Sequence, residues 1–220
     1  MTAPLTDSLG NPVTLRDESS LAAINDFVEG FIACEARAVN VLQAQADASP
    51  LVQAYCAALH MFAESADAPR NARPFIQQAL AHAHQASERE QRFVAAVAAW
   101  VDGDLPRAIA LHEEQARLNP RDLASLKLGQ YHLFNRGDSP AMLRLALQAQ
   151  HAAADVPYLH GMLAFGWEQC HRLKEAEAAA HHAIHRCRKE PWAHHALAHV
   201  MLTQGRISEG IDFMSSVSNT

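Results

Sequence analysis

The fold is decided by four short segments that recur every 34 residues: GDLPRA at 103–108, GDSPAM at 137–142, HRLKEA at 171–176 and GRISEG at 205–210. Glycine at the first position suits the end of a helix, where the chain turns into the left-handed region. Proline, at the fourth position of the first two copies, suits the first turn of the following helix. Every copy therefore predicts a helix, a tight turn and a second helix. The third copy begins with His171, so we expect a different cap at that turn.

Extending the repeat predicts four helix pairs, at 89–102 and 105–118, 123–136 and 139–153, 157–171 and 173–189, and 191–204 and 207–217. Upstream, 50–66 and 73–88 indicate an irregular pair, and 19–31 with 35–47 indicates one more pair or one kinked helix. We expect residues 1–16 to be extended or coil. The predicted fold is all-α, a right-handed α-solenoid in which each helix–turn–helix repeat buries its apolar face on its neighbours. We expect a single domain over 1–220, with irregular pairs over 19–88 and four repeats over 89–217.

The composition supports a globular helical protein and argues against several classes. Hydrophobic residues make up 49% and charged residues 19% of the 220 residues, which argues against disorder. The net charge of −6 argues against sequence-independent nucleic-acid binding, which needs a basic face. We see neither a signal peptide nor an apolar run long enough to span a membrane, so we expect a cytoplasmic protein. The cysteines form no CxxC pair and are expected to be reduced, mostly buried thiols: Cys34, Cys56, Cys170 and Cys187.

A 34-residue helix–turn–helix unit with glycine, proline and small-residue positions resembles the tetratricopeptide repeat. Three other stretches narrow the resemblance to the tetratricopeptide repeat protein 38 family: DSLGNPVTL near the start, EARAVNVLQAQADASP at 35–50 and EPWAHHALAHVMLTQGRISEGIDFMSSVSNT at 190–220. Members of that family continue beyond the point where this chain ends, with helices rich in Trp and His. The resemblance implies an α-solenoid and implies no particular activity.

In solenoids of this type the first helix of each pair lines the concave face. The 34-residue spacing aligns aromatic and histidine positions along these first helices. The candidate ligand-binding residues are Phe93, Trp100, Tyr131, Phe134, Phe165, Glu168, His195 and His199. A groove lined in this way suits a peptide helix or a small organic ligand. The alternative is that some of these rings only pack between helices.

His195 and His199 are candidate metal ligands, because side chains four residues apart share one helix face. Zinc would need a third ligand, for which the candidates are His160, His194 and Glu168. The zincin motif is excluded, because Ala196 stands where that motif requires Glu. A second group of histidines lies on a helix expected to face outward and indicates only adventitious metal binding: His181, His182 and His185.

Two functions stay open on this basis. The first is a non-enzymatic scaffold that binds a peptide or protein partner in its groove, which fits the lack of a complete catalytic motif. The second is an enzyme, or a small-molecule or metal-binding protein, whose site forms around His195 and His199. No cofactor is expected other than a divalent metal in the second case.

The last predicted helix, near 207–217, has two apolar faces. Ile207, Ile211 and Met214 lie at spacings of four and three, and we expect this stripe to face the helix at 191–204. Phe213 and Val217 would then lie exposed on a different face. The exposed patch predicts that the chain is a fragment of a longer protein or forms a homodimer through its C-terminal helix.

Overall fold

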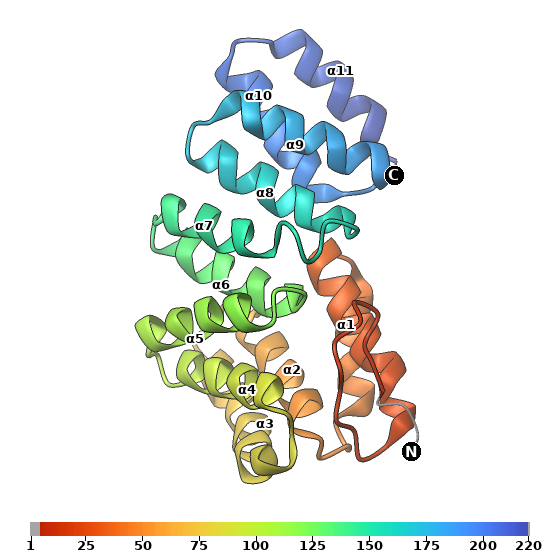
Figure 1. The fold of residues 1–220 in the computed structure, drawn as a ribbon, viewed down its shortest axis with the longest axis vertical. Coiled ribbons are helices and arrows are strands. Elements are labelled where there is room, and N and C mark those ends of the chain that lie inside the picture. The colour runs from red at the N-terminus through yellow and green to blue at the C-terminus, as the bar shows by residue number, and fades with distance from the viewer. Residues whose placement is uncertain (1–4, 220) are drawn as a thin grey trace. The chain divides into compact units, whose positions relative to one another are not determined.

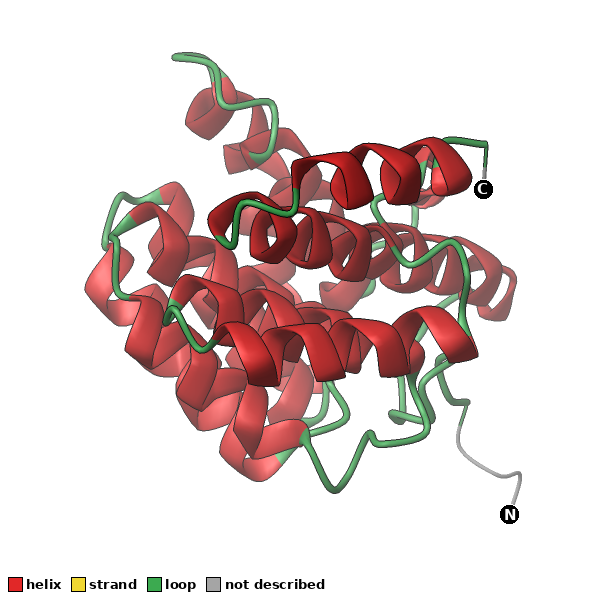
Figure 2. Cartoon of the chain, turned by 90° about the horizontal axis from the view of Figure 1, so that it is seen from above, coloured by secondary structure: helices red, strands yellow, loops and turns green. Residues whose placement is uncertain are grey.

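The computed structural model describes residues 5–219, and its regular structure there is helical (Figures 1 and 2), apart from one isolated bridge between Thr6 and Pro12. This confirms the predicted all-α fold. The chain divides into two compact units, residues 1–129 and residues 130–220. Each unit is described by itself below, and helix α6 (Leu123–Asn135) contributes to both.

Unit 1 consists of α-helices and shorter 3-10 segments in the order η1 (Glu18–Ser20), α1 (Leu21–Ala33), η2 (Ala36–Ala44), α2 (Pro50–Met61), α3 (Ala68–His82), η3 (Ala83–Gln85), α4 (Glu88–Val101) and α5 (Leu105–Leu118). Neighbours in sequence pack together: α1 with η2, α2 with α3, and α4 with α5. The segment expected as one kinked helix or a pair is a pair, because Cys34 adopts a left-handed conformation with φ 56° after α1. Helix α3 begins five residues earlier than expected and contains Pro74.

The N-terminal segment of unit 1 is held by buried polar groups. The Thr14 backbone N–H and hydroxyl both donate to the Glu90 carboxylate, at 2.7 and 2.8 Å. Beside it, Arg89 and Asp122 form an ion pair at 2.8 Å, with both side chains buried. Removing one partner of such a pair is costly, because the other charge stays buried. The segment is thus anchored to the buried Glu90 of unit 1.

Unit 2 continues with α7 (Ser139–Ala149), α8 (Pro157–Gln169), α9 (Leu173–Arg186), α10 (Pro191–Thr203) and α11 (Ile207–Val217). Helix α8 packs on α9, α10 packs on both of them, and α11 packs on α10 (Figure 1). Fully buried alanines on α8 and α9 allow α10 to approach closely: Ala164, Ala180 and Ala183.

All four repeat turns share one backbone geometry. Gly103, Gly137, His171 and Gly205 have φ values of 79°, 73°, 57° and 74°. At each turn the N–H of this residue donates to the carbonyl three residues back, and the next N–H donates to the carbonyl five residues before itself, at 2.8–3.1 Å. This is the Schellman pattern of a helix C-terminus. The expectation of a different cap at His171 is therefore wrong, since the histidine adopts the same left-handed conformation as the glycines.

The orientation of α11 is the reverse of the expected one. Phe213 packs on the core of unit 2, and its ring meets the His194 ring at 5.9 Å, while Val217 is buried. Ile211 and its stripe face outward. Gly210 also lies near α10, where an added Cβ atom would meet Met201 at 3.5 Å.

The cysteines differ from expectation in their burial. Cys56 is buried, Cys170 and Cys187 are half-buried, and Cys34 is exposed, so the prediction of mostly buried thiols is wrong. All four lie among the described residues, and no disulfide joins them. Burial raises the pKa of the Cys56 thiol to about 12. Among the described helices, none combines the length and the apolar composition needed to cross a membrane.

Candidate functional site

Five of the eight predicted site residues lie together in unit 2, on the first helices of successive pairs. They come from the end of α6, from α8 and from α10. With one further residue, Trp192, they form what we call the aromatic–histidine surface: Phe134, Phe165, Glu168, Trp192, His195 and His199.

Phe165 is the centre of this surface. Its ring centroid lies 5.4 Å from those of Phe134, Trp192 and His195. Phe165 itself is only 8% exposed, whereas Phe134 is 46% exposed and His195 is also exposed. A buried ring thus supports neighbouring rings that are open to solvent, and these offer a preformed apolar contact area.

A hydrogen-bonding group lies next to the rings. The His195 and His199 ring centroids are 4.2 Å apart, and Nδ1 of His199 lies 3.3 Å from Oε1 of Glu168. The other carboxylate oxygen of Glu168 accepts a hydrogen bond from the Gln169 amide at 2.8 Å. The Glu168 side chain is 11% exposed and that of His199 is 42% exposed, so the histidine is the more accessible partner. The surface therefore combines apolar rings with one imidazole–carboxylate pair.

Local sequence explains why α10 presents its histidines here. Pro191 begins the helix, and the buried Glu190 caps it by accepting a hydrogen bond from the Ala193 N–H. The Glu190 carboxylate lies against Gly161 of α8, where a Cβ atom would collide with it. This contact fixes the start of α10 on α8, and the four-residue spacing then places His195 and His199 on one face.

The other predicted site residues are placed differently. Phe93 has no exposed surface, and its ring packs against those of Tyr55 and His112, with centroids at 5.1 and 6.2 Å. Trp100 is likewise buried and lies edge-on to Phe62 at 5.2 Å. Both are core residues of unit 1, because Tyr55 of α2 packs on Phe93, and Phe62, the residue after α2, packs on Trp100. Tyr131, in unit 2, is half-buried, and its ring centroid is 5.5 Å from that of His132.

Of the three further candidate metal ligands, Glu168 contacts His199, whereas His160 and His194 do not join the histidine pair. His160 contacts the Ala154 carbonyl at 2.9 Å and the His182 ring at 4.3 Å. His194 contacts the Arg188 carbonyl at 2.7 Å. Over residues 5–219, no group of three or more His, Cys, Asp or Glu side chains is arranged to hold a metal ion.

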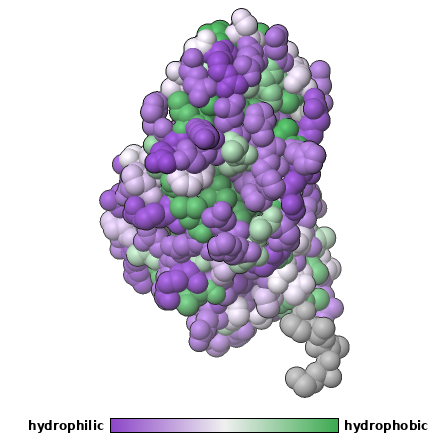
Figure 3. Space-filling model, turned by 45° about the horizontal axis from the view of Figure 1, so that its top comes forward, coloured by the Kyte–Doolittle hydropathy of each residue, from purple (hydrophilic) through white to green (hydrophobic). Residues whose placement is uncertain are grey.

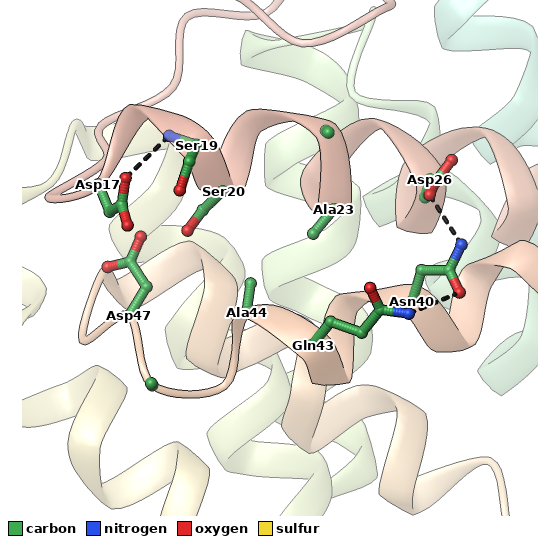
Figure 4. Close-up of a pocket in the computed structure, with 11 residues that line it drawn as sticks. Asp17, Ser19, Ser20, Ala23, Asp26, Asn40, Gln43, Ala44 and Asp47 are labelled. Atoms are coloured by element: carbon green, nitrogen blue, oxygen red, sulfur yellow. Dashed lines mark hydrogen bonds between the residues drawn. The ribbon is translucent and has the colours of Figure 1, made fainter.

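Two features were missed by sequence reasoning. Trp192 carries a signal that could have found it, since it lies three residues before His195 on the same helix. The second feature is a polar pocket of about 270 Å³ in unit 1, between α1 and η2 (Figure 4). Asp17 and Asp47 lie at one end of it, and Asp26 accepts a hydrogen bond from Asn40 at the other, at 2.8 Å. No motif in the sequence pointed to this pocket.

No protein-family model matches the chain. Two similar solved structures are of MamA, a tetratricopeptide-repeat protein. One is MamA 41-end from Desulfovibrio magneticus RS-1, at 14% identity, and the other is a MamA RS-1 ArsTM double mutant, at 15% identity. Each has a TM-score of 0.53 over 76% of this chain and 93% of the MamA chain. The chain therefore has an all-α fold of the tetratricopeptide type, while the narrower resemblance to the tetratricopeptide repeat protein 38 family stays a prediction.

Proposed function

We propose that the chain is a binding scaffold that holds a peptide or protein partner on the aromatic–histidine surface of unit 2. The observation that carries the proposal is the exposed Phe134 ring, which is 46% exposed beside the buried Phe165 ring. Rigid aromatic side chains contribute much of the binding energy at protein interfaces, since they bury a large area at a small cost in entropy. Repeat folds of this type use their first helices as extended binding surfaces.

The chemistry of the surface defines the partner that fits. An apolar or aromatic side chain of the partner would pack on Phe134 and the exposed edge of His195. A polar group next to it would hydrogen-bond with His199, which Glu168 orients from 3.3 Å. We therefore infer a peptide in which an aromatic or large aliphatic residue stands close to a hydrogen-bonding side chain.

The proposal is tested with a displayed peptide library selected on the wild-type protein, followed by calorimetric titration of the selected peptides. Phe134→Ala and His195→Ala should each weaken binding by at least about tenfold, as expected for contacts at the centre of an interface. His185→Ala is the matched control, because His185 is exposed on α9 and outside the surface. Peptides that bind all four proteins equally would contradict the proposal, and so would a failure to select any peptide.

The alternative function is metal or small-molecule binding at His195 and His199. The ring separation of 4.2 Å and the neighbouring Glu168 carboxylate favour it. A zinc ion at this place would need ligands beyond the histidine pair. Zinc titration of untagged protein separates the two functions. Stoichiometric binding that His199→Ala abolishes would favour the metal site, and a protein that takes up no zinc but binds the selected peptides would favour the scaffold.

A further inference from the structure

The His199 ring presents one of its nitrogens to Glu168 and the other to solvent. Nδ1 lies 3.3 Å from Oε1 of Glu168, and the two nitrogens of an imidazole point in different directions. Among the residues that the structure describes, none forms a hydrogen bond with Nε2, and this atom is not buried, since the side chain is 42% exposed. Nε2 is therefore the atom of the imidazole–carboxylate pair that a partner can reach.

The carboxylate decides which of the two nitrogens carries the proton. An ionised carboxylate can only accept hydrogen bonds, so Nδ1 of His199 is the donor. A neutral imidazole has a single N–H group, and Nε2 is then left with its lone pair. The Gln169 amide donates to the second oxygen of Glu168 at 2.8 Å and helps to hold the carboxylate in place. In its neutral form, His199 therefore offers a partner a hydrogen-bond acceptor and no donor.

A partner that covers the neighbouring rings also has to satisfy this acceptor. Hydrophilic residues border the hydrophobic patches on the face shown in Figure 3, so a partner that packs on apolar side chains also displaces water from polar atoms. A polar atom that loses water and gains no hydrogen bond weakens the binding. A carboxylate of the partner has no proton to donate, and the charge of Glu168 repels it.

We propose that Glu168 is a positioning residue that makes the aromatic–histidine surface selective for hydrogen-bond donors, an inference that rests on the proposed peptide-binding function. The partner residue beside the aromatic or aliphatic anchor then carries a hydroxyl, amide or ammonium group. Its O–H or N–H donates to Nε2 of His199. Acidic side chains are rejected at that position.

The first test needs no partner, because it measures the position of the proton directly. Long-range 1H–15N correlation spectra of the free protein distinguish a protonated Nδ1 from a protonated Nε2. They are recorded at about pH 8, where histidine side chains are generally neutral. The His199 signals, assigned with His199→Gln, should show the proton on Nδ1. A proton mainly on Nε2, or an equal mixture, would overturn the inference and leave the proposed peptide binding untouched.

The second test compares two peptides that differ in their ability to donate. A peptide selected on the wild type is synthesised with serine at its hydrogen-bonding position, and again with O-methylserine, which keeps the oxygen but has no proton to donate. Calorimetric titration at the same pH should give binding at least about tenfold weaker for the O-methylserine version, because the acceptor on the protein is left unpaired. Equal affinities would contradict the inferred partner.

Glu168→Gln separates this selectivity from a merely structural role. Gln169 can bond the oxygen of the new amide, whose N–H group then donates to Nδ1 of His199, so that Nε2 carries the proton. Either peptide can accept that proton, and the ratio of their affinities should fall below about threefold, with unchanged circular dichroism. Glu209→Gln removes an exposed carboxylate of α11 and should keep the wild-type ratio.

The remaining outcomes distinguish this inference from the proposed function. A wild-type ratio in Glu168→Gln would overturn the role of Glu168, although the peptides still bind. A library that yields no peptide refutes the proposed function, and with it the partner inferred here, whatever the position of the proton on His199.

Discussion

His132 is a histidine in unit 2 with 1% of its surface exposed, and burial lowers its pKa to about 4. In the unfolded chain its pKa is about 6.5. As the pH falls below about 6.5, the unfolded state therefore binds a proton that the folded state does not, and stability is lost down to about pH 4, by up to about 3 kcal/mol. Urea unfolding at several pH values measures this loss.

The variant His132→Leu should remove that contribution to the pH dependence. The exposed His185 provides the control, since His185→Leu should lose stability on acidification as the wild type does. Equal pH dependence in the wild type and in His132→Leu would show that the buried histidine does not oppose folding in acid.

His171 should be a strained position, because it is the one repeat-turn residue with a side chain in the left-handed conformation, at φ 57°. Replacing it with glycine should stabilise the protein by about 0.5–1 kcal/mol, as glycine adopts this conformation without a steric cost. His181→Gly, at an exposed histidine inside α9, should instead lose about 0.3–0.5 kcal/mol. Thermal unfolding compares the two, and a lower melting temperature for His171→Gly than for the wild type would contradict the interpretation.

At the residue scale, the sequence could predict which residues of unit 2 lie together, but not which of the candidate rings are buried in the core. The spacing correctly brought Phe165, His195 and His199 together, since they occupy equivalent faces of first helices. The spacing could not show that Phe93 is a core residue, because a ring at the equivalent helix position can either point to solvent or pack against a neighbouring helix. The rings that cover Phe93 and Trp100 come from α2 and the residue after it, Tyr55 and Phe62. That helix lies outside the 34-residue repeat, so the repeat gives no information about its contacts.

At the scale of single helices, close packing of α9 depends on its small residues. Ala176 is fully buried on the packed side of this helix, whereas Ala178 is exposed. Ala176→Trp should lower the free energy of unfolding by about 1–3 kcal/mol, because the larger side chain forces the helices apart. Ala178→Trp adds the same side chain to the same helix and should leave stability nearly unchanged. Chemical denaturation of both variants measures the difference, and equal stabilities would show that the assigned packing face is wrong.

Helix α11 shows why the position of a helix is easier to predict than its rotation. Its bounds match the prediction. The helix carries two apolar stripes, and the one formed by Ile207, Ile211 and Met214 was expected to face α10. Phe213 and Val217, rather than the Ile211 stripe, lie on the buried side. Residue spacing gives the positions of both stripes but does not say which of them meets the neighbouring helix.

At the scale of the whole molecule, the helix positions were predicted correctly in the part of the chain that contains the 34-residue repeat. From residue 88 onward each helix begins within one residue of its predicted start, because left-handed turn residues and N-terminal prolines mark the boundaries. Upstream no such spacing exists, and the 3-10 segment η2 and the early start of α3 were not predicted. The described structure divides into two compact units. The expectation of a single domain stays a prediction.

The central claim is that a partner binds on the aromatic–histidine surface, and the indole N–H signals in a two-dimensional NMR spectrum test it most directly. The chain has three tryptophans, of which Trp192 lies on this surface and Trp100 is buried in unit 1. Titration with a selected peptide should shift the Trp192 indole signal, assigned with Trp192→Phe, and leave the Trp100 signal in place. A shift of the Trp100 signal with no change at Trp192 would contradict the claim.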